Sequence, residues 1–191
     1  MVLQINAQVA DDRGANMRTV SAEIERHLIP LIGLPLSLIQ RVADLRVFQF
    51  GAIRHSDAGA VGRYAIHIQC PWRLDHDDRI VTGRTDLWEP LDSSAVVDWD
   101  AWHYDHEANL QDALLTNFIP HQSQDIQSQS AQIHQLVVEA VEADAYGGAI
   151  ITFSDNYRLV IFPAGSGGED WRIFQPATSE PHFVIAGGMI E

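Results

Sequence analysis

The sequence predicts an α+β fold in which two helices pack on antiparallel β-meander sheets. Three observations predict this class: two segments carry apolar residues at helical spacing, short segments rich in Val, Ile, Tyr and Phe fill much of the remaining chain, and Gly, Pro, Asp and Asn separate them at short intervals. The chain has 191 residues, of which 46% are hydrophobic, enough to bury one sizeable core. We therefore predict a single domain over residues 1–191.

The first helix is predicted near residues 15–29. Apolar residues recur there at intervals of three and four, with charged residues elsewhere on the helical wheel; the apolar positions are Met17, Val20, Ile24, Leu28 and Leu31. Pro30 predicts the end of this helix because it cannot continue the backbone hydrogen bonds. The PLIGLP segment that begins there is predicted to lead by a loop to the first strand at 45–51.

The remaining strands are predicted from β-branched and aromatic residues between turn signals. They lie near 63–70, 136–145, 148–154, 157–163, 170–175 and 182–187, with a shorter candidate at 79–82. In the strand at 63–70, Cys70 continues the apolar face of Tyr64, Ile66 and Ile68. We therefore expect Cys70 to be a small buried hydrophobe with a raised thiol pKa.

The second helix is predicted near residues 104–119. Trp102, His106, Leu110, Leu114 and Phe118 recur at helical spacing, and acidic residues occupy the predicted first turn, where the helix dipole favours them. Pro120 closes this helix. The segment HQSQDIQSQSAQ that follows is almost free of apolar residues and is predicted to be a surface loop.

The two halves of the chain share a short pattern. Tyr64-x-Ile66-x-Ile68 followed by Trp72-Arg73-Leu74 parallels Tyr157-x-Leu159-x-Ile161 followed by Trp171-Arg172-Ile173. The pattern predicts an internal repeat of a helix-plus-sheet unit, over 1–95 and 98–191. Two meanders built from the same residue types also match by chance, so both explanations stay open.

Charge is distributed unevenly along the chain. All twelve basic residues are Arg, against 26 acids. Residues 1–84 carry a net charge of +1, whereas 85–191 carry −15, with Arg158 and Arg172 as the only basic residues there. A phosphate backbone needs a basic stripe, so nucleic-acid binding is not expected. The acidic half favours a basic protein partner or, alternatively, serves only solubility.

Targeting signals are not evident in the sequence. Apolar runs are too short for the roughly 20 residues that cross a bilayer, and the N-terminus lacks the pattern of a secretory signal, so no membrane association is expected. Cys70 is the only cysteine, which excludes an internal disulfide. We expect a cytoplasmic protein.

The last fifty residues resemble uncharacterised families of small acidic bacterial proteins, some of which are similar to immunity proteins of polymorphic toxin systems. The resemblance rests on a strand, a Gly turn, a hairpin around an Asp, a Pro-bearing loop, a Glu-x-Trp element and a final Gly-Gly; these pieces are Gly147, Gly148, Asp155, Pro163, Glu169, Trp171, Gly187 and Gly188. It implies a bacterial origin and an immunity-like role, and it carries over no active site.

Several groups of residues have features of a chemical site. His103 and His106 lie three residues apart, as on one side of a helix, but no third metal ligand is identifiable. The acidic segment 75–78 lacks the alternating ligands and central Gly of a calcium loop and is predicted to be a solvated turn. Cys70 and Ser166 lack a recognisable catalytic partner. We therefore predict no catalytic residue, no metal site and no cofactor.

The tryptophans around residues 88–102 allow two interpretations. Trp88, Trp99 and Trp102 bracket an acidic segment and would line a ligand groove or a partner-binding patch if they were exposed. We expect core packing instead, because Trp88 follows a strand candidate and Trp102 shares the face of the second helix with Leu110.

Two function classes remain. The first is an acidic interaction protein, immunity-like in its most concrete form, whose partner-binding carboxylates are Glu139, Glu142, Asp144, Asp155, Glu169 and Asp170. The second is an enzyme or small-ligand protein that uses His67, Arg63 and Gln69 on the polar face of one strand, with no reaction type defined. An enzyme is the less favoured class, and self-association as a homodimer is left open.

Overall fold

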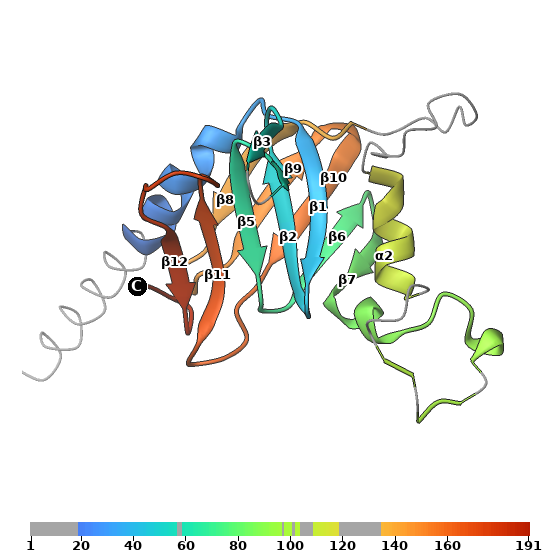
Figure 1. The fold of residues 1–191 in the computed structure, drawn as a ribbon. Helices are drawn as coiled ribbons and strands as arrows, with labels where there is room; N and C mark the ends of the chain where they lie inside the picture. Colours follow the sequence, from blue (N-terminus) through green and yellow to red (C-terminus); the bar gives the residue numbers. More distant parts are fainter. Residues whose placement is uncertain (1–18, 57–58, 97, 101, 104–108, 119–134) are drawn as a thin grey trace, which may run out of the picture.

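In the computed structural model, the described residues are 19–56, 59–96, 98–100, 102–103, 109–118 and 135–191. They form two large antiparallel sheets and a small hairpin (Figure 1). The six-stranded sheet has the order β1 (Leu36–Val42), β2 (Leu45–Phe50), β5 (Tyr64–Ile68), β11 (Glu169–Phe174), β12 (Phe183–Ala186), β13 (Met189–Ile190). The five-stranded sheet has the order β7 (Arg79–Gly83), β6 (Trp72–His76), β10 (Tyr157–Ile161), β9 (Ala149–Phe153), β8 (Val138–Ala143). The hairpin pairs β3 (Arg54–Ser56) with β4 (Gly59–Val61).

The core lies between the two sheets, where side chains of alternate strand positions interdigitate. Phe48 on β2 meets Trp72 on β6 edge to face, with ring centroids 5.3 Å apart. Phe50 and Phe153 stack across the same layer at 6.4 Å. Trp171 is fully buried, and its indole N–H donates to the carbonyl oxygen of Gly147 at 2.7 Å, so the largest core side chain has no unsatisfied donor.

Two helical segments lie at opposite sides of the paired sheets (Figure 1). The first, described from 19 to 28 and followed by η1 (Ile29–Leu31), contacts both sheets: Glu25 accepts from the Ala143 amide of β8 at 3.2 Å, and His27 stacks on Phe183 of β12. The second consists of α2 (Leu110–Leu115) and η4 (Thr116–Phe118). Within the described residues, no helix is long and apolar enough to span a membrane.

A buried polar contact attaches α2 to both sheets. Gln111 donates to the carbonyl oxygen of Gly83 on β7 at 2.6 Å, and Arg46 of β2 donates to both Gln111 and Asp112, the latter at 2.7 Å. Arg41 of β1 reaches the same carboxylate at 3.1 Å. Burial lowers the pKa of Arg46, and the Asp112 carboxylate opposes that shift. The second helix is therefore held by charge-assisted hydrogen bonds as well as by its apolar face.

The same strand order occurs in each half of the chain. In the six-stranded sheet the order begins β1-β2-β5-β11-β12, and in the five-stranded sheet the order read from the other edge is β8-β9-β10-β6-β7. Each half supplies a three-stranded meander to one sheet and then sends its last hairpin, β6–β7 or β11–β12, into the sheet of the other half. Each sheet is therefore completed by the other half of the chain.

The correspondence extends to single residues. The β1–β2 pair has a register shift between Leu36 and Leu38, and the β8–β9 pair has one between Val138 and Ala140. Trp72 lies opposite Ile161, just as Trp171 lies opposite Ile68. Backbone hydrogen bonds also come in pairs: the Leu36 amide donates to Leu136 at 2.8 Å and the Val138 amide donates to Leu34 at 3.0 Å.

The predicted α+β class with two helices on antiparallel sheets is confirmed. Each predicted strand has a counterpart within a few residues, whereas β1, β6 and the short strands β3, β4 and β13 were missed. Residues 36–42 were predicted as a loop between two prolines and the next strand, but four consecutive buried residues, 36–39, make them a strand with both faces covered. Residues 104–108 of the second predicted helix lie outside the described residues; its described part begins at Leu110, capped by the Asn109 side chain.

Candidate functional site

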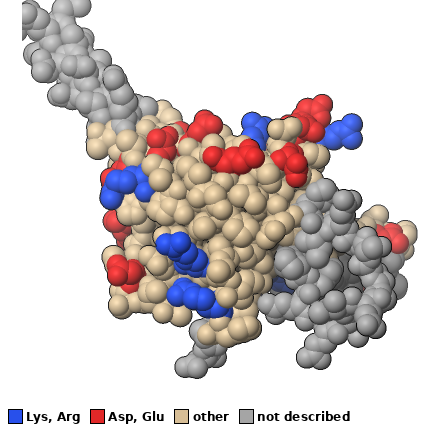
Figure 2. Space-filling view, turned by 90° about the horizontal axis from the view of Figure 1, so that it is seen from above, with Lys and Arg blue, Asp and Glu red and all other residues tan. Residues whose placement is uncertain are grey.

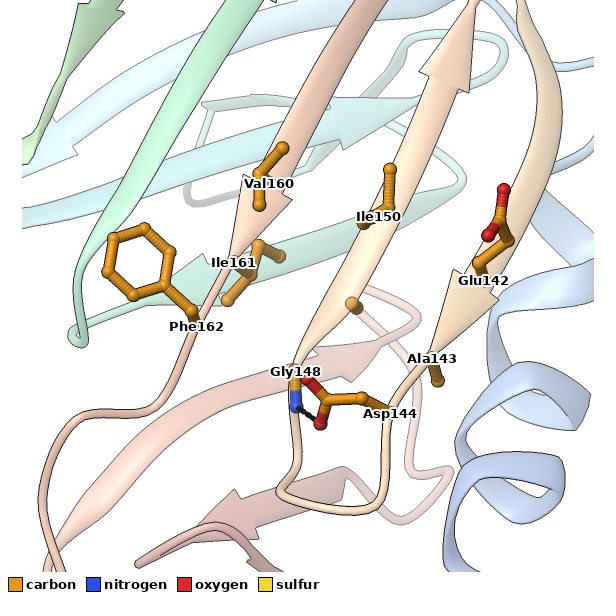
Figure 3. Close-up of a pocket in the computed structure, with 9 residues that line it drawn as sticks. Glu142, Ala143, Asp144, Gly148, Ile150, Val160, Ile161 and Phe162 are labelled. Atoms are coloured by element: carbon orange, nitrogen blue, oxygen red, sulfur yellow. Dashed lines mark hydrogen bonds between the residues drawn. The ribbon is translucent and has the colours of Figure 1, made fainter. Parts of the chain in front are cut away.

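A shallow hollow of about 240 Å³ lies on the outer face of the five-stranded sheet (Figure 3). Its lining comes from β8, β9, β10 and the turn between β8 and β9; the lining residues are Glu142, Ala143, Asp144, Gly148, Ala149, Ile150, Val160, Ile161 and Phe162. Phe162 is 39% exposed and lies beside two aliphatic side chains of the lining, Ile150 and Val160. The hollow is thus an accessible apolar surface with carboxylates at its border.

Strand pairing explains why these side chains meet. Glu142 of β8 lies opposite Ile150 of β9, and Ile150 lies opposite Val160 of β10. Directly opposed residues of antiparallel strands share a face, so the three side chains form one row across the sheet. Their chain neighbours Ile151 and Ile161 point to the opposite face and are buried in the core. The same alternation that builds the core therefore leaves this row on the outside.

Asp144 is fixed at the end of the hollow by the turn that it closes. Its carboxylate accepts from the amides of Tyr146 and Gly148, both at 2.8 Å. Gly147 has a φ of +82°, and a side chain at Gly148 would collide with the Asp144 carboxylate, so both positions require glycine. The second bond of this pair is drawn in Figure 3. Asp144 is therefore a preorganised negative charge.

The charged side chains that line the hollow are acidic, but a basic side chain borders it: the Arg73 guanidinium lies 5.9 Å from the centre of the Phe162 ring. Glu142 and Asp144 are the charged residues among its lining, and Glu139 is exposed on the same strand. Figure 2 shows acidic and basic side chains side by side along one margin of the surface seen from above, and basic side chains again below its middle. A cationic side chain entering this hollow would meet apolar walls and the carboxylates of Glu142 and Asp144, with the Arg73 guanidinium beside the Phe162 wall.

The predicted partner-binding carboxylates are not all brought together. Glu139, Glu142 and Asp144 lie on β8 and its turn, whereas Asp155 is exposed in the turn at the opposite end of β9. Glu169 and Asp170 belong to β11 of the other sheet.

These last two carboxylates are occupied within the fold. Arg172 donates two hydrogen bonds to Glu169, one of them 2.6 Å long, and although burial opposes the shift, this contact holds the pKa of Glu169 below its usual value. Asp170 is only 6% exposed and accepts from the Gly188 amide at 2.8 Å. Its prediction as a surface contact must be corrected, because the strand places its side chain against the final Gly-Gly turn.

The acidic segment 75–78 also differs from the predicted solvated turn. Asp75 belongs to β6 and is buried, with ion pairs to Arg73 at 2.9 Å and to Arg158 at 3.5 Å. Only Asp77 and Asp78 form the turn. The two arginines occupy the carboxylate that a cation would need. Within the part of the chain that the structure describes, no three His, Cys, Asp or Glu side chains are placed to hold a metal ion, and His106 lies outside that part.

Cys70 has the environment that was predicted for it. Its side chain belongs to the core, and burial raises the pKa of the thiol to about 12. A thiol of this pKa is protonated at neutral pH and is a poor nucleophile. Ser166 lies exposed in the loop between β10 and β11.

The polar face of β5, the alternative site, packs against its own neighbours. His67 contacts the Phe174 ring edge to face at 4.7 Å, and Phe174 stacks on His182 at 4.2 Å. Burial, and then the nearby Arg172 guanidinium, lower the pKa of His67. Arg63 instead lies over the Tyr64 ring. The imidazole is therefore held neutral in an aromatic contact, and this arrangement defines no reaction.

Burial of the tryptophans at 88–102 was predicted wrongly. Trp88 is 48% exposed and Trp99 is 56% exposed, while Trp102 is partly buried and donates its indole N–H to the Trp88 carbonyl oxygen at 3.1 Å. The short helix η2 (Arg84–Trp88) turns the chain away after β7, and Leu87 takes the buried position. Because Leu87 points into the core, the adjacent Trp88 side chain is left exposed to solvent.

Comparison with protein families, with curated proteins and with solved structures finds no match.

Proposed function

We propose that this protein binds a basic protein partner through the hollow on the five-stranded sheet and the carboxylates of β8. The observation that carries the proposal is an apolar floor, made by the partly buried Ile150 and Val160 and the exposed Phe162, next to the fixed carboxylate of Asp144 and the exposed carboxylate of Glu142. An arginine or lysine has a long aliphatic stem and a cationic end, so it matches both parts of this surface.

The size of the hollow favours a side chain over a free small molecule. Pockets for drug-sized ligands commonly hold about 300–1,000 Å³, whereas this hollow holds about 240 Å³ and is open to solvent. Protein interfaces are dominated by a few anchor side chains that enter such depressions. A protruding basic residue of a partner is therefore the occupant that we propose.

The most concrete form of this function is neutralisation of a toxin. A toxin that cuts nucleic acid needs a basic cleft, and a carboxylate surface that covers the cleft would associate fast and in a salt-sensitive manner. The sequence resemblance of the last fifty residues to immunity-like families supports the same proposal. A neighbouring toxin gene in the native genome would supply the partner to be tested.

The test compares two charge-matched double variants in surface-based kinetics with that partner. Glu139→Gln/Glu142→Gln removes two charges beside the hollow, and Asp78→Asn/Glu180→Gln removes two exposed charges elsewhere. We expect the first pair to slow association roughly tenfold at low salt, because steering depends on local charge, and the control pair to have less than about a twofold effect. High salt should abolish the difference. Equal rates for the two pairs would exclude this surface.

A further inference from the structure

A second exposed surface lies in the segment between β7 and α2. Along the sequence, this segment is far from β9 and β10, which form the floor of the hollow. We name the described residues 88–96, 98–100 and 102 the tryptophan segment. Trp88, Leu91 and Trp99 are each about half exposed, at 48%, 55% and 56%. Single exposed apolar residues are common, but two tryptophans and a leucine within twelve residues indicate an interaction surface.

The segment is anchored at several points. Its base is joined to the second helix by a hydrogen bond from the Leu110 amide to the Glu89 carbonyl oxygen, 2.8 Å long. Trp102 donates its indole N–H to Trp88 and its amide to the carbonyl oxygen of Trp99, at 3.1 and 3.3 Å. Asp92 caps the short helix η3 (Ser93–Ala95) by accepting from the Ser94 amide. These contacts link the three tryptophans to one another and to the fold.

The Asp and Glu residues of this segment are not accompanied by any Arg or Lys within residues 88–102. Glu89, Asp92, Asp98 and Asp100 are exposed, and the sequence has no Arg or Lys between Arg84 and Arg158. Anionic ligands such as nucleic acid or an acidic membrane surface would be repelled. The complementary ligand is a cation that also offers a flat face to an indole ring.

We infer that the tryptophan segment binds an arginine-rich peptide segment of a protein partner. A guanidinium group stacks on the face of an indole and forms paired hydrogen bonds with carboxylates, so one arginine uses both chemistries of this surface. Lysine provides the charge without the planar group. The segment should therefore prefer arginine to lysine at equal charge. The inference does not rest on the hollow, since the two surfaces share no residue.

The test measures binding of octa-arginine and octa-lysine peptides by titration calorimetry with the whole protein. In the wild type we expect octa-arginine to bind at least about fivefold more tightly than octa-lysine. Trp88→Ala/Trp99→Ala should reduce this ratio to near one, because the remaining attraction is charge alone. Trp88→Phe/Trp99→Phe should keep part of the preference, since phenyl rings still stack.

The control is Glu139→Gln/Glu142→Gln, which should weaken both peptides equally and leave the ratio unchanged. Circular dichroism shows whether the Ala variant folds. If it does not, the Phe variant decides, and an affinity ratio of octa-arginine to octa-lysine equal to that of the wild type overturns the inference. It is likewise overturned if the folded Ala variant keeps the full preference. It also fails if the preference is lost only in the β8 variant, or if an uncharged oligosaccharide binds the segment more tightly than octa-arginine.

We also infer, from the strand order, that the two halves are copies of one ancestral unit. Leu36 and Leu38, which flank the register shift of the β1–β2 pair, lie 102 residues before Val138 and Ala140, which flank the shift of the β8–β9 pair. In the same way, β5 begins 93 residues before β10, and both are the middle strands of the shared five-strand order. Phe50 and Phe153 occupy equivalent positions and stack on each other. Chance similarity of two meanders does not require matching irregularities.

Sequences of relatives test this second inference. If the halves are copies, residues paired at these spacings should be more similar across the relatives than residues paired at shifted spacings. Absence of any excess would mean that two meanders converged on one arrangement.

Discussion

The outer faces of the two sheets carry different side chains on equivalent strands. On the five-stranded sheet, one row across β8, β9, β10 and β6 reads Glu142, Ile150, Val160 and Arg73. On the six-stranded sheet, the equivalent row across β1, β2, β5 and β11 reads Gln40, Val47, His67 and Arg172.

These two rows differ in what covers them. Val47 is only 3% exposed and His67 packs on Phe174, so the six-stranded face is occupied by its own side chains. The other row borders the open hollow. The two sheets have the same strand order, yet the outer face of the six-stranded sheet is closed and that of the five-stranded sheet is open. The side chains of the two rows account for this difference.

The largest effect is expected at the inner faces, where the two halves should behave alike. Replacing Phe50 or Phe153 by Ala removes one ring of the stacked pair and leaves a cavity in the core. We expect each substitution to lower the free energy of unfolding by about 3–5 kcal/mol, measured by urea denaturation. A loss in one variant more than twice that in the other would contradict the equivalence of the two inner faces.

A pH-dependent effect is expected on the closed face. The pKa of His67 is lowered in the folded protein, so the unfolded chain binds the proton more tightly. Stability from this group is therefore full above the unfolded pKa of about 6.5 and is lost as the pH falls below it. His67→Gln should flatten the loss of unfolding free energy between pH 7 and pH 5.5. An unchanged slope of unfolding free energy against pH, measured by urea denaturation, would refute a neutral, partly buried imidazole at His67.

The smallest effect on stability is expected on the open face. Phe162 is 39% exposed, so Phe162→Ala should change the free energy of unfolding by less than about 1 kcal/mol. The same variant should weaken binding of a basic partner, because it removes one wall of the hollow. A matched substitution, Val42→Ala, removes an exposed apolar side chain on the other sheet and should leave binding unchanged. Equal loss of affinity in both variants would count against the hollow.

Strands with clear turn signals could be predicted from the sequence. The segments around 148–154 and 157–163 are rich in β-branched residues and separated by Asp and Asn, whose positive φ values form the turn. The strand at 36–42 was missed because the Pro and Gly before it signal a loop, while its own buried run lacks alternation.

The candidate site was only partly predictable for a similar reason. Glu142 and Asp144 were named from charge, but the apolar floor comes from β9 and β10, and only the pairing of these strands with β8 places it beside those carboxylates. Asp170 looks like any other acid in the sequence, and only the tertiary position of Gly188 shows that it is buried. The exposure of Trp88 likewise follows from where η2 turns the chain.

The exchange of hairpins between the two sheets has a consequence during synthesis. The edge of β5 that pairs with β11 stays without its partner until about a hundred further residues have been made. At roughly 5–20 residues per second, this interval lasts on the order of 5–20 s. For that time the nascent chain presents an open strand edge, which can pair with other extended chains. By contrast, β10 finds β6 already made as it leaves the ribosome. The first half therefore carries an unpaired strand edge until the second half has been made.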